Sequence, residues 1–227
     1  MPILADQSAH GLLPTRAYRY CEAARIASSL GWYVFPPVSY SILYDGAAVF
    51  WKMDDDAEWS RLEEATLEAD LDQFDANCPK ELVGHCPPMV GAAEGGMLQI
   101  ATGLAVTTPP DWGVLIRKPP NIPQKNHLEY FEGFVQTGKW FGPLFINLKP
   151  MKTDVEIRFE ADWPVAFVQP IPISVTQPSV FQNVSFVSEF SEFSDEDWQS
   201  FGDTVLHRLG PDREVAKYAK AVRKKSS

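Results

Sequence analysis

The stretch from Gln99 to Ile173 decides the fold of this 227-residue chain: QIATGLAVTTPPDWGVLIRKPPN (99–121), YFEGFVQTGKWFGPLFINLKP (130–150) and TDVEIRFEADWPVAFVQPIPI (153–173). Apolar and polar residues alternate around Leu144, Ile146 and Leu148, and this period of two predicts half-buried strands. Frequent Pro-rich joints are typical of barrels and sandwiches rather than of parallel sheets. We therefore expect residues 97–173 to form the β core of an α+β fold, as a β barrel or sandwich.

Outside this core the apolar residues take helical spacing. Residues 15–30 form a stripe that Gly31 ends, and residues 194–227 predict C-terminal helices capped by Ser194. An acidic helix is expected over 54–76 and a loop over 77–96, while Asp45-Gly46 between two β-rich runs predicts a hairpin. The helices thus lie at the N-terminus, in an insertion and at the C-terminus of one domain, residues 1–227.

The composition of the chain restricts the classes of partner that it can bind. The chain has 20 Lys+Arg against 30 Asp+Glu, a net charge of −10, and this field repels nucleic-acid phosphates and anionic lipid surfaces. No apolar run reaches the roughly 18 residues of a membrane span, and the N-terminus lacks a basic region followed by an apolar one. Three cysteines without a secretion signal indicate free thiols. We expect a cytoplasmic protein with neither a nucleic-acid nor a membrane partner.

The familiar catalytic motifs are missing, but the central block carries a resemblance. Gly103-Leu104, Pro110-Asp111-Trp112-Gly113 with Arg117, the run EGFVQTGKWFGPLFINL (132–148) with its Asn147, and Val168-Gln169 are similar to motifs of the deoxyuridine triphosphatase and deoxycytidine triphosphate deaminase superfamily. This resemblance covers residues 102–171 and implies a β-clip fold. The whole chain also resembles an uncharacterised bacterial family known as a domain of unknown function, which implies no chemistry.

The sequence differs from the superfamily at the positions that carry the catalytic chemistry of the family. Gln136 stands where the family has its water-activating Asp, Lys118 replaces the Ser after the Arg, and no Gly-rich phosphate-closing tail follows. A neutral amide cannot act as a general base. The resemblance therefore implies the fold without pyrophosphatase activity.

Our first hypothesis is a protein that binds a small polar or anionic ligand, with the activity of a tailoring enzyme left open and no cofactor expected. Arg117 would bind an anionic group through its guanidinium, and Gln136 and Gln169 would form hydrogen bonds with the ligand through their side-chain amides. Trp140 would stack on the ligand. We expect these four side chains to converge on one concavity. Each residue also has a structural interpretation: Arg117 could pair with an acid of this acidic chain, and Trp140 could belong to the core.

Two other hypotheses stay open. His127 and Glu129, in an H-x-E spacing, could join His207 as ligands of Fe(II) in a non-haem oxygenase, because residues two apart share one face of a strand. Cys78, His85 and Cys86 offer three zinc ligands where a structural site needs four. Alternatively, the chain is a non-catalytic assembly subunit of a homo-oligomer, for which the resembled β-clip fold is suited.

Overall fold

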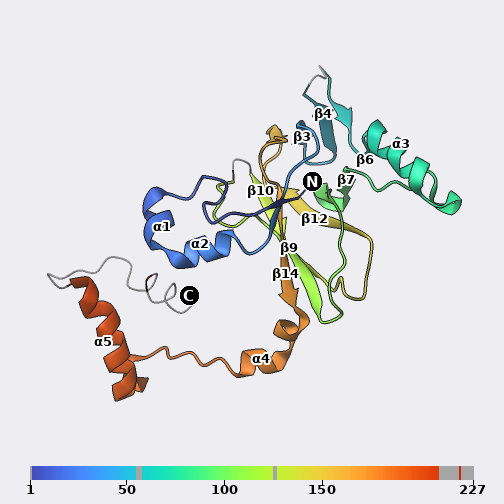
Figure 1. Cartoon of the computed structure of the whole chain (residues 1–227). Coiled ribbons are helices and arrows are strands. Elements are labelled where there is room, and N and C mark those ends of the chain that lie inside the picture. Colours follow the sequence, from blue (N-terminus) through green and yellow to red (C-terminus); the bar gives the residue numbers. More distant parts are fainter. Residues whose placement is uncertain (1, 55–57, 125–126, 210–219, 221–227) are drawn as a thin grey trace.

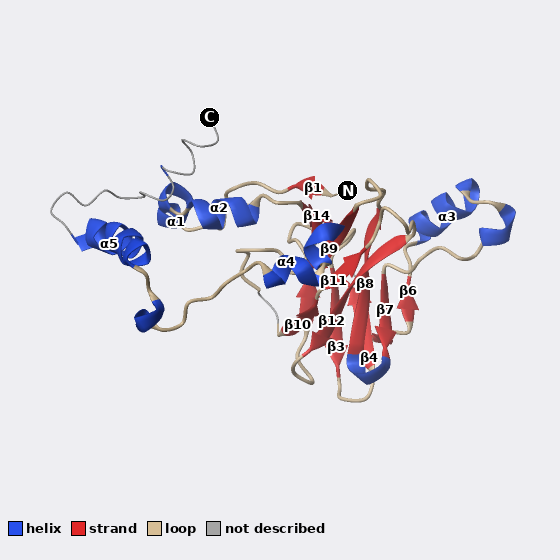
Figure 2. Cartoon of the chain, turned by 90° about the horizontal axis from the view of Figure 1, so that it is seen from below, coloured by secondary structure: helices blue, strands red, loops and turns tan. Residues whose placement is uncertain are grey.

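The computed structural model describes residues 2–54, 58–124, 127–209 and 220. Its strands form three antiparallel sheets, and the helices project from their rim (Figures 1 and 2). The fold is therefore α+β and mainly β, as the alternation predicted. Within the described residues each sheet has two edge strands, so the sheets form open layers and no barrel closes.

The first sheet has the order β1-β2-β14-β9-β11, formed by Ile3–Leu4, Trp32–Val34, Ala166–Pro172, Trp112–Arg117 and Gly133–Val135. The second has the order β10-β12-β8-β7-β6, formed by Leu128–Phe131, Pro143–Pro150, Met97–Ala105, Val90–Ala93 and Glu64–Ala65. The third has the order β13-β3-β4-β5, formed by Ile157–Phe159, Tyr40–Tyr44, Val49–Met53 and Ser60–Arg61.

One apolar core joins the three sheets. On β12 the expected alternation is confirmed, since Leu144, Ile146 and Leu148 are buried there. They pack with residues of the other two sheets, such as Ile116 on β9 and Ile42 on β3. A second, smaller core on the other face of the first sheet contains Ala5, Ala9, Tyr33, Ile122 and Phe167. The first sheet is thus covered on both faces.

The hairpin at Asp45-Gly46 is confirmed as β3 and β4, which pair from Tyr40 with Met53 to Tyr44 with Val49. The carboxylate of Asp45 accepts hydrogen bonds from the backbone N–H groups of Ala47 and Ala48 at 2.8 and 2.7 Å. These donors lower the pKa of that carboxyl, because they stabilise its charged form. Gly46 takes a φ of +99°, which is open to glycine at no steric cost.

The N-terminal helical stripe forms two helices, α1 (Thr15–Tyr20) and α2 (Glu22–Ser28), which meet at Cys21. Near the C-terminus lie α4 (Pro178–Gln182) and α5 (Asp195–Leu209), and Ser194 caps α5 as predicted, with the Asp197 N–H donating to its Oγ at 3.2 Å. The helix expected beyond Gly210-Pro211 falls outside the described residues apart from Lys220. Four short 3-10 turns complete the described chain: η1 (Lys80–Leu82), η2 (Glu94–Gly96), η3 (Ile173–Thr176) and η4 (Phe190–Glu192).

The helix expected over 54–76 is wrong in its first half. There the chain forms β5 and β6, and only Glu68–Asn77 is helical, as α3. Leu62 and Ala65 are buried in the main core beside β4 and β7, so sheet packing outweighs local helix propensity. No residue of α3 itself is buried, because the helix extends away from the sheets (Figures 1 and 2).

The loop expected over 77–96 is also wrong in its second half. Val90–Ala93 forms β7, which pairs with β6 on one side and β8 on the other. The run VGAA shows no alternation, since three of its four side chains are Gly or Ala, and pairing with β8 makes it a strand. Within the described residues, no helix combines the length and the apolar character that crossing a membrane requires.

Candidate functional site

Arg117 ends β9, the strand that lies between β14 and β11 in the first sheet. Its Nε lies 3.4 Å from Oε1 of Glu132, which precedes β11, and both side chains are more than a third exposed. This separation makes an ion pair, but the Nε–H of Arg117 has no hydrogen-bond acceptor and is itself buried. The interpretation that Arg117 pairs with an acid of this chain is confirmed.

The segment after Arg117, residues 118–123, has a restricted backbone, and we call it the proline wall. Pro119, Pro120 and Pro123 restrict its backbone, and Pro119 and Ile122 are buried. Asn121, at a φ of +59°, donates from Nδ2 to the carbonyl of Ala24 at 3.1 Å and to the Ser28 Oγ at 2.9 Å. The wall is therefore held against α2.

This wall encloses an open hollow of about 470 Å³ lined by Arg117, Lys118, Pro119, Pro120, Asn121, Ile122, Pro123 and Glu132. We call it the Arg117 hollow. Two cations and one carboxylate line it, so its local charge is positive in a chain of net charge −10. Its volume falls within the range of small-molecule sites, about 300–1,000 Å³.

The strand register divides the four predicted ligand residues into two pairs. Arg117 lies opposite Phe167 and Gln169 opposite Leu115, so Arg117 and Gln169 share one face of the first sheet. Gln136 follows Val135, which pairs with Val114, and therefore lies at the other end of β9. At about 3.3 Å per residue, this end is about 13 Å from Arg117. The four side chains do not converge on the Arg117 hollow, because Arg117 is the one residue of the four that lines it.

Gln136 and Trp140 flank the turn that the sequence predicted. The carbonyl of Gln136 accepts the N–H groups of Lys139 and Trp140 at 2.9 and 3.1 Å, and the side chains of Gln136 and Trp140 are exposed. The ring of Trp140 packs over Gly142, where an added Cβ would lie 2.6 Å from the ring. Trp140 is thus a surface residue rather than a core residue, and its predicted stacking role is not tested by the structure.

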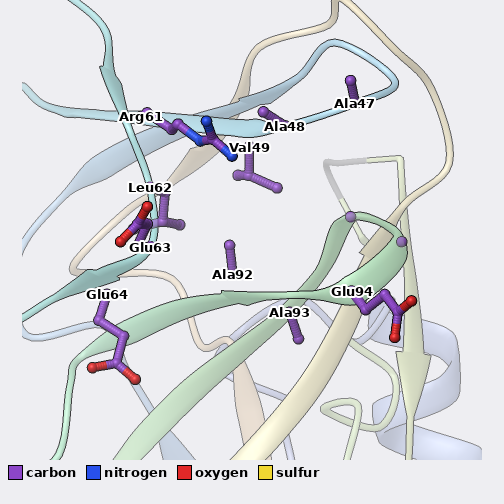
Figure 3. A pocket seen from close by; sticks show the side chains of 12 residues that line it. Ala47, Ala48, Val49, Arg61, Leu62, Glu63, Glu64, Ala92, Ala93 and Glu94 are labelled. Atoms are coloured by element: carbon purple, nitrogen blue, oxygen red, sulfur yellow. The ribbon is translucent and has the colours of Figure 1, made fainter.

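A second hollow, which the sequence did not indicate, has a volume of about 700 Å³ and is lined by Ala47, Ala48, Val49, Arg61, Leu62, Glu63, Glu64, Ala92, Ala93, Glu94, Gly95 and Gly96. The guanidinium of Arg61 points towards Ala48 and Val49 across it (Figure 3). Small side chains on β7 and on the β3–β4 turn leave this space, and small residues far apart in sequence carry no signal that they will meet. Three carboxylates against one guanidinium make it a poorer anion site than the Arg117 hollow.

The predicted metal ligands lie on an edge of the second sheet and in the segment around α3. His127 and Glu129 are both exposed, at the start of β10 and within it, and the side chain of His207 lies outside the described part of the chain. Cys78 and Cys86 direct their Sγ atoms to the backbone carbonyls of Asp75 and Asp70. Among the described residues, no group of three or more His, Cys, Asp or Glu side chains is placed to hold a metal ion.

No protein-family model and no curated protein sequence matches the chain. Among solved structures, it is similar to a mutant dUTPase of Staphylococcus bacteriophage 80alpha with dUpNHpp, at 18% identity, with 78% of this chain and 86% of that chain covered and a TM-score of 0.36. A likeness at this identity and TM-score says nothing of the ligand of this chain.

Proposed function

We propose that this protein binds a small anionic molecule in the Arg117 hollow. The observation that carries the proposal is that Arg117 and Lys118 line one proline-walled hollow together, with Glu132 as the one carboxylate among its lining residues. A carboxylate or phosphate oxygen in the hollow would accept charge-assisted hydrogen bonds from the guanidinium of Arg117.

The surrounding charges support the same ligand class. Lys118 adds a second cation beside Arg117, and the exposed Glu132 is the one carboxylate among the lining residues. Because Glu132 pairs with Arg117, it is not a free general base, and the lining supports binding rather than proton-transfer catalysis.

The test is a thermal-unfolding series of the purified chain with inorganic phosphate and with citrate as probes. A ligand that binds only the folded state raises the unfolding midpoint as its concentration rises. We expect this rise in the wild type, its loss in Arg117→Ala and its reduction in Arg117→Lys, which keeps the charge but loses the planar fork.

Arg61→Ala is the matched control, because it removes the same side chain from the other hollow. It should leave the anion-dependent rise unchanged. If neither anion raises the midpoint of the wild type, or if Arg61→Ala abolishes the rise and Arg117→Ala keeps it, the proposal is overturned.

A further inference from the structure

The chain after β14 leaves the body of the molecule as an exposed arm. We call residues 174–206 the C-terminal arm; it contains α4, η4 and α5 as far as Leu206, and none of its residues is buried. Both views show it outside the sheets (Figures 1 and 2). Its exposed large apolar residues are Val175, Val180, Phe181, Val184, Phe186, Val187, Phe190, Trp198, Phe201 and Leu206. So much exposed apolar surface marks an interaction site.

The length and the exposed rings of helix α5 also indicate that the arm packs on a partner. It is 15 residues long, and isolated helices of about this length are marginal in water unless an apolar face packs on something. Phe190, Phe193, Trp198 and Phe201 form a ring cluster at its start, with neighbouring centroids 4.9–5.9 Å apart. Trp198 and Phe201 nevertheless remain more than 40% exposed, so the cluster keeps an uncovered side.

The charge of the arm defines what can cover it. Between Arg158 and Arg208 the sequence has no Lys or Arg, whereas the second half of the arm contains Glu189, Glu192, Asp195, Glu196, Asp197 and Asp203. A complementary surface must therefore be basic and must offer aromatic or apolar area.

The helix α1 is such a surface on this same chain. Arg16, Arg19 and Tyr20 lie at positions i, i+3 and i+4 and so share one helix face. All three are exposed, α1 contains no acidic residue, and neither arginine forms an ion pair within the described residues. A guanidinium can lie over the face of a tryptophan ring while it pairs with a carboxylate, so this face fits Trp198 and its acidic neighbours.

We propose that the C-terminal arm of one copy docks through Trp198 and Phe201 onto the Arg16–Arg19–Tyr20 face of α1 in a second copy. Both faces are exposed within the single chain, and they carry opposite charges. Because the two faces differ, the contact is head-to-tail, and repetition of it builds a ring or a chain of copies. This contact does not involve the Arg117 hollow, so either proposal can fail without the other.

Sedimentation equilibrium of the full chain tests the contact over a range of protein concentration. We expect the wild-type mass to rise with concentration and the association to weaken at high salt, because its ion pairs are screened. Arg16→Glu/Arg19→Glu and Glu192→Arg/Asp195→Arg should each weaken the association by about tenfold or more, since each places like charges opposite one another. Lys139→Glu/Lys152→Glu makes the same charge change as the first variant at exposed positions outside α1 and should leave the association unchanged.

The decisive sample is a mixture of the two charge-reversed variants. The basic arm of one then meets the acidic α1 of the other, and association should return, whereas docking of an arm onto α1 of its own chain cannot be rescued by mixing. A wild type that stays monomeric at all concentrations overturns the proposal. So does a mixture that associates no better than its components.

Discussion

The sheet body and the C-terminal arm use the same kinds of apolar residue in opposite ways. Leu148 on β12 is completely buried among residues of three sheets, whereas Phe186 in the arm is 89% exposed. Burying an apolar side chain of this size stabilises a fold by about 1.5–3 kcal/mol. The body therefore supplies the stability of the protein, and the apolar residues of the arm are available for contacts between molecules.

The largest contrast is expected from truncating one residue in each region. Leu148→Ala should lower the free energy of unfolding by about 2–5 kcal/mol, because it removes buried methyl groups and leaves a cavity. Phe186→Ala should change it by less than about 0.5 kcal/mol. Urea unfolding of dilute protein measures both values. A comparable loss in the two variants would show that the arm packs on the body.

A smaller contrast is expected from adding one methyl group to a glycine. In Gly31→Ala the new Cβ would lie 2.2 Å from the carbonyl oxygen of Val168 on β14, and the steric overlap should cost about 1–3 kcal/mol. Gly202 lies inside α5 with nothing within 4 Å of an added Cβ. Gly202→Ala should stabilise α5 by up to about 1 kcal/mol, because alanine is the better helix former.

Urea unfolding measures the first change, and hydrogen exchange of the α5 amides measures the second. The two substitutions should therefore change stability in opposite directions. Destabilisation of α5 by Gly202→Ala would mean that a surface already packs closely against this glycine.

The smallest effect concerns the hydroxyl of Tyr40, which is buried in the body and has no hydrogen-bond partner among the described residues. Tyr40→Phe should raise the free energy of unfolding by about 1 kcal/mol at neutral pH, since it removes an unsatisfied polar group. The ring remains to stack on Phe159, at a centroid separation of 4.9 Å. A loss of stability in this variant, measured by urea unfolding, would show that the hydroxyl has a partner.

The hydroxyls of Tyr33, Tyr40 and Tyr130 should make the stability of the body fall at alkaline pH. Burial raises the pKa of Tyr130 to about 12 and that of Tyr40 further, and burial with the charge of Asp6 raises the pKa of Tyr33 to about 12. Because the folded values exceed the ordinary value of 10, the folded state disfavours ionisation of these hydroxyls, and the stability that depends on their protonated form is fully present below pH 10. That stability is lost as the pH rises from 10 through 12 and beyond. Tyr40→Phe should lessen this loss, which unfolding curves at increasing pH measure.

Local sequence patterns predicted the parts of the fold whose signal is local. Alternation around Ile146 marked β12, Asp45-Gly46 marked the hairpin, and Ser194 marked the start of α5, because each depends on residues close together in the chain. Residues 60–65 and 90–93 were predicted wrongly because pairing with β4, β7 and β8 forms their strands, and their own residues carry no alternation that marks it.

The candidate site, too, was predicted from the sequence only in part. Arg117 was found from its residue type and its place beside a proline-rich corner, both visible in the sequence. The separation of Gln136 from Arg117 follows from the register of β9 and β11, and the register of two strands depends on their pairing rather than on composition. The hollow around Arg61 arises where three segments meet, so no single segment carries a sign of it.

The sequence by itself determined that this is a mainly β protein of strongly acidic net charge, because strand alternation and charge are properties of residue order and composition. Tertiary structure alone decided which polar residues meet. Strand pairing brings Arg117 to Glu132, and a hydrogen bond from Asn121 to Ala24, 97 positions away, anchors the proline-rich segment on α2. Tertiary structure also decided that the arm stays uncovered, because exposure depends on whether the rest of the chain reaches a segment, which its own sequence does not specify.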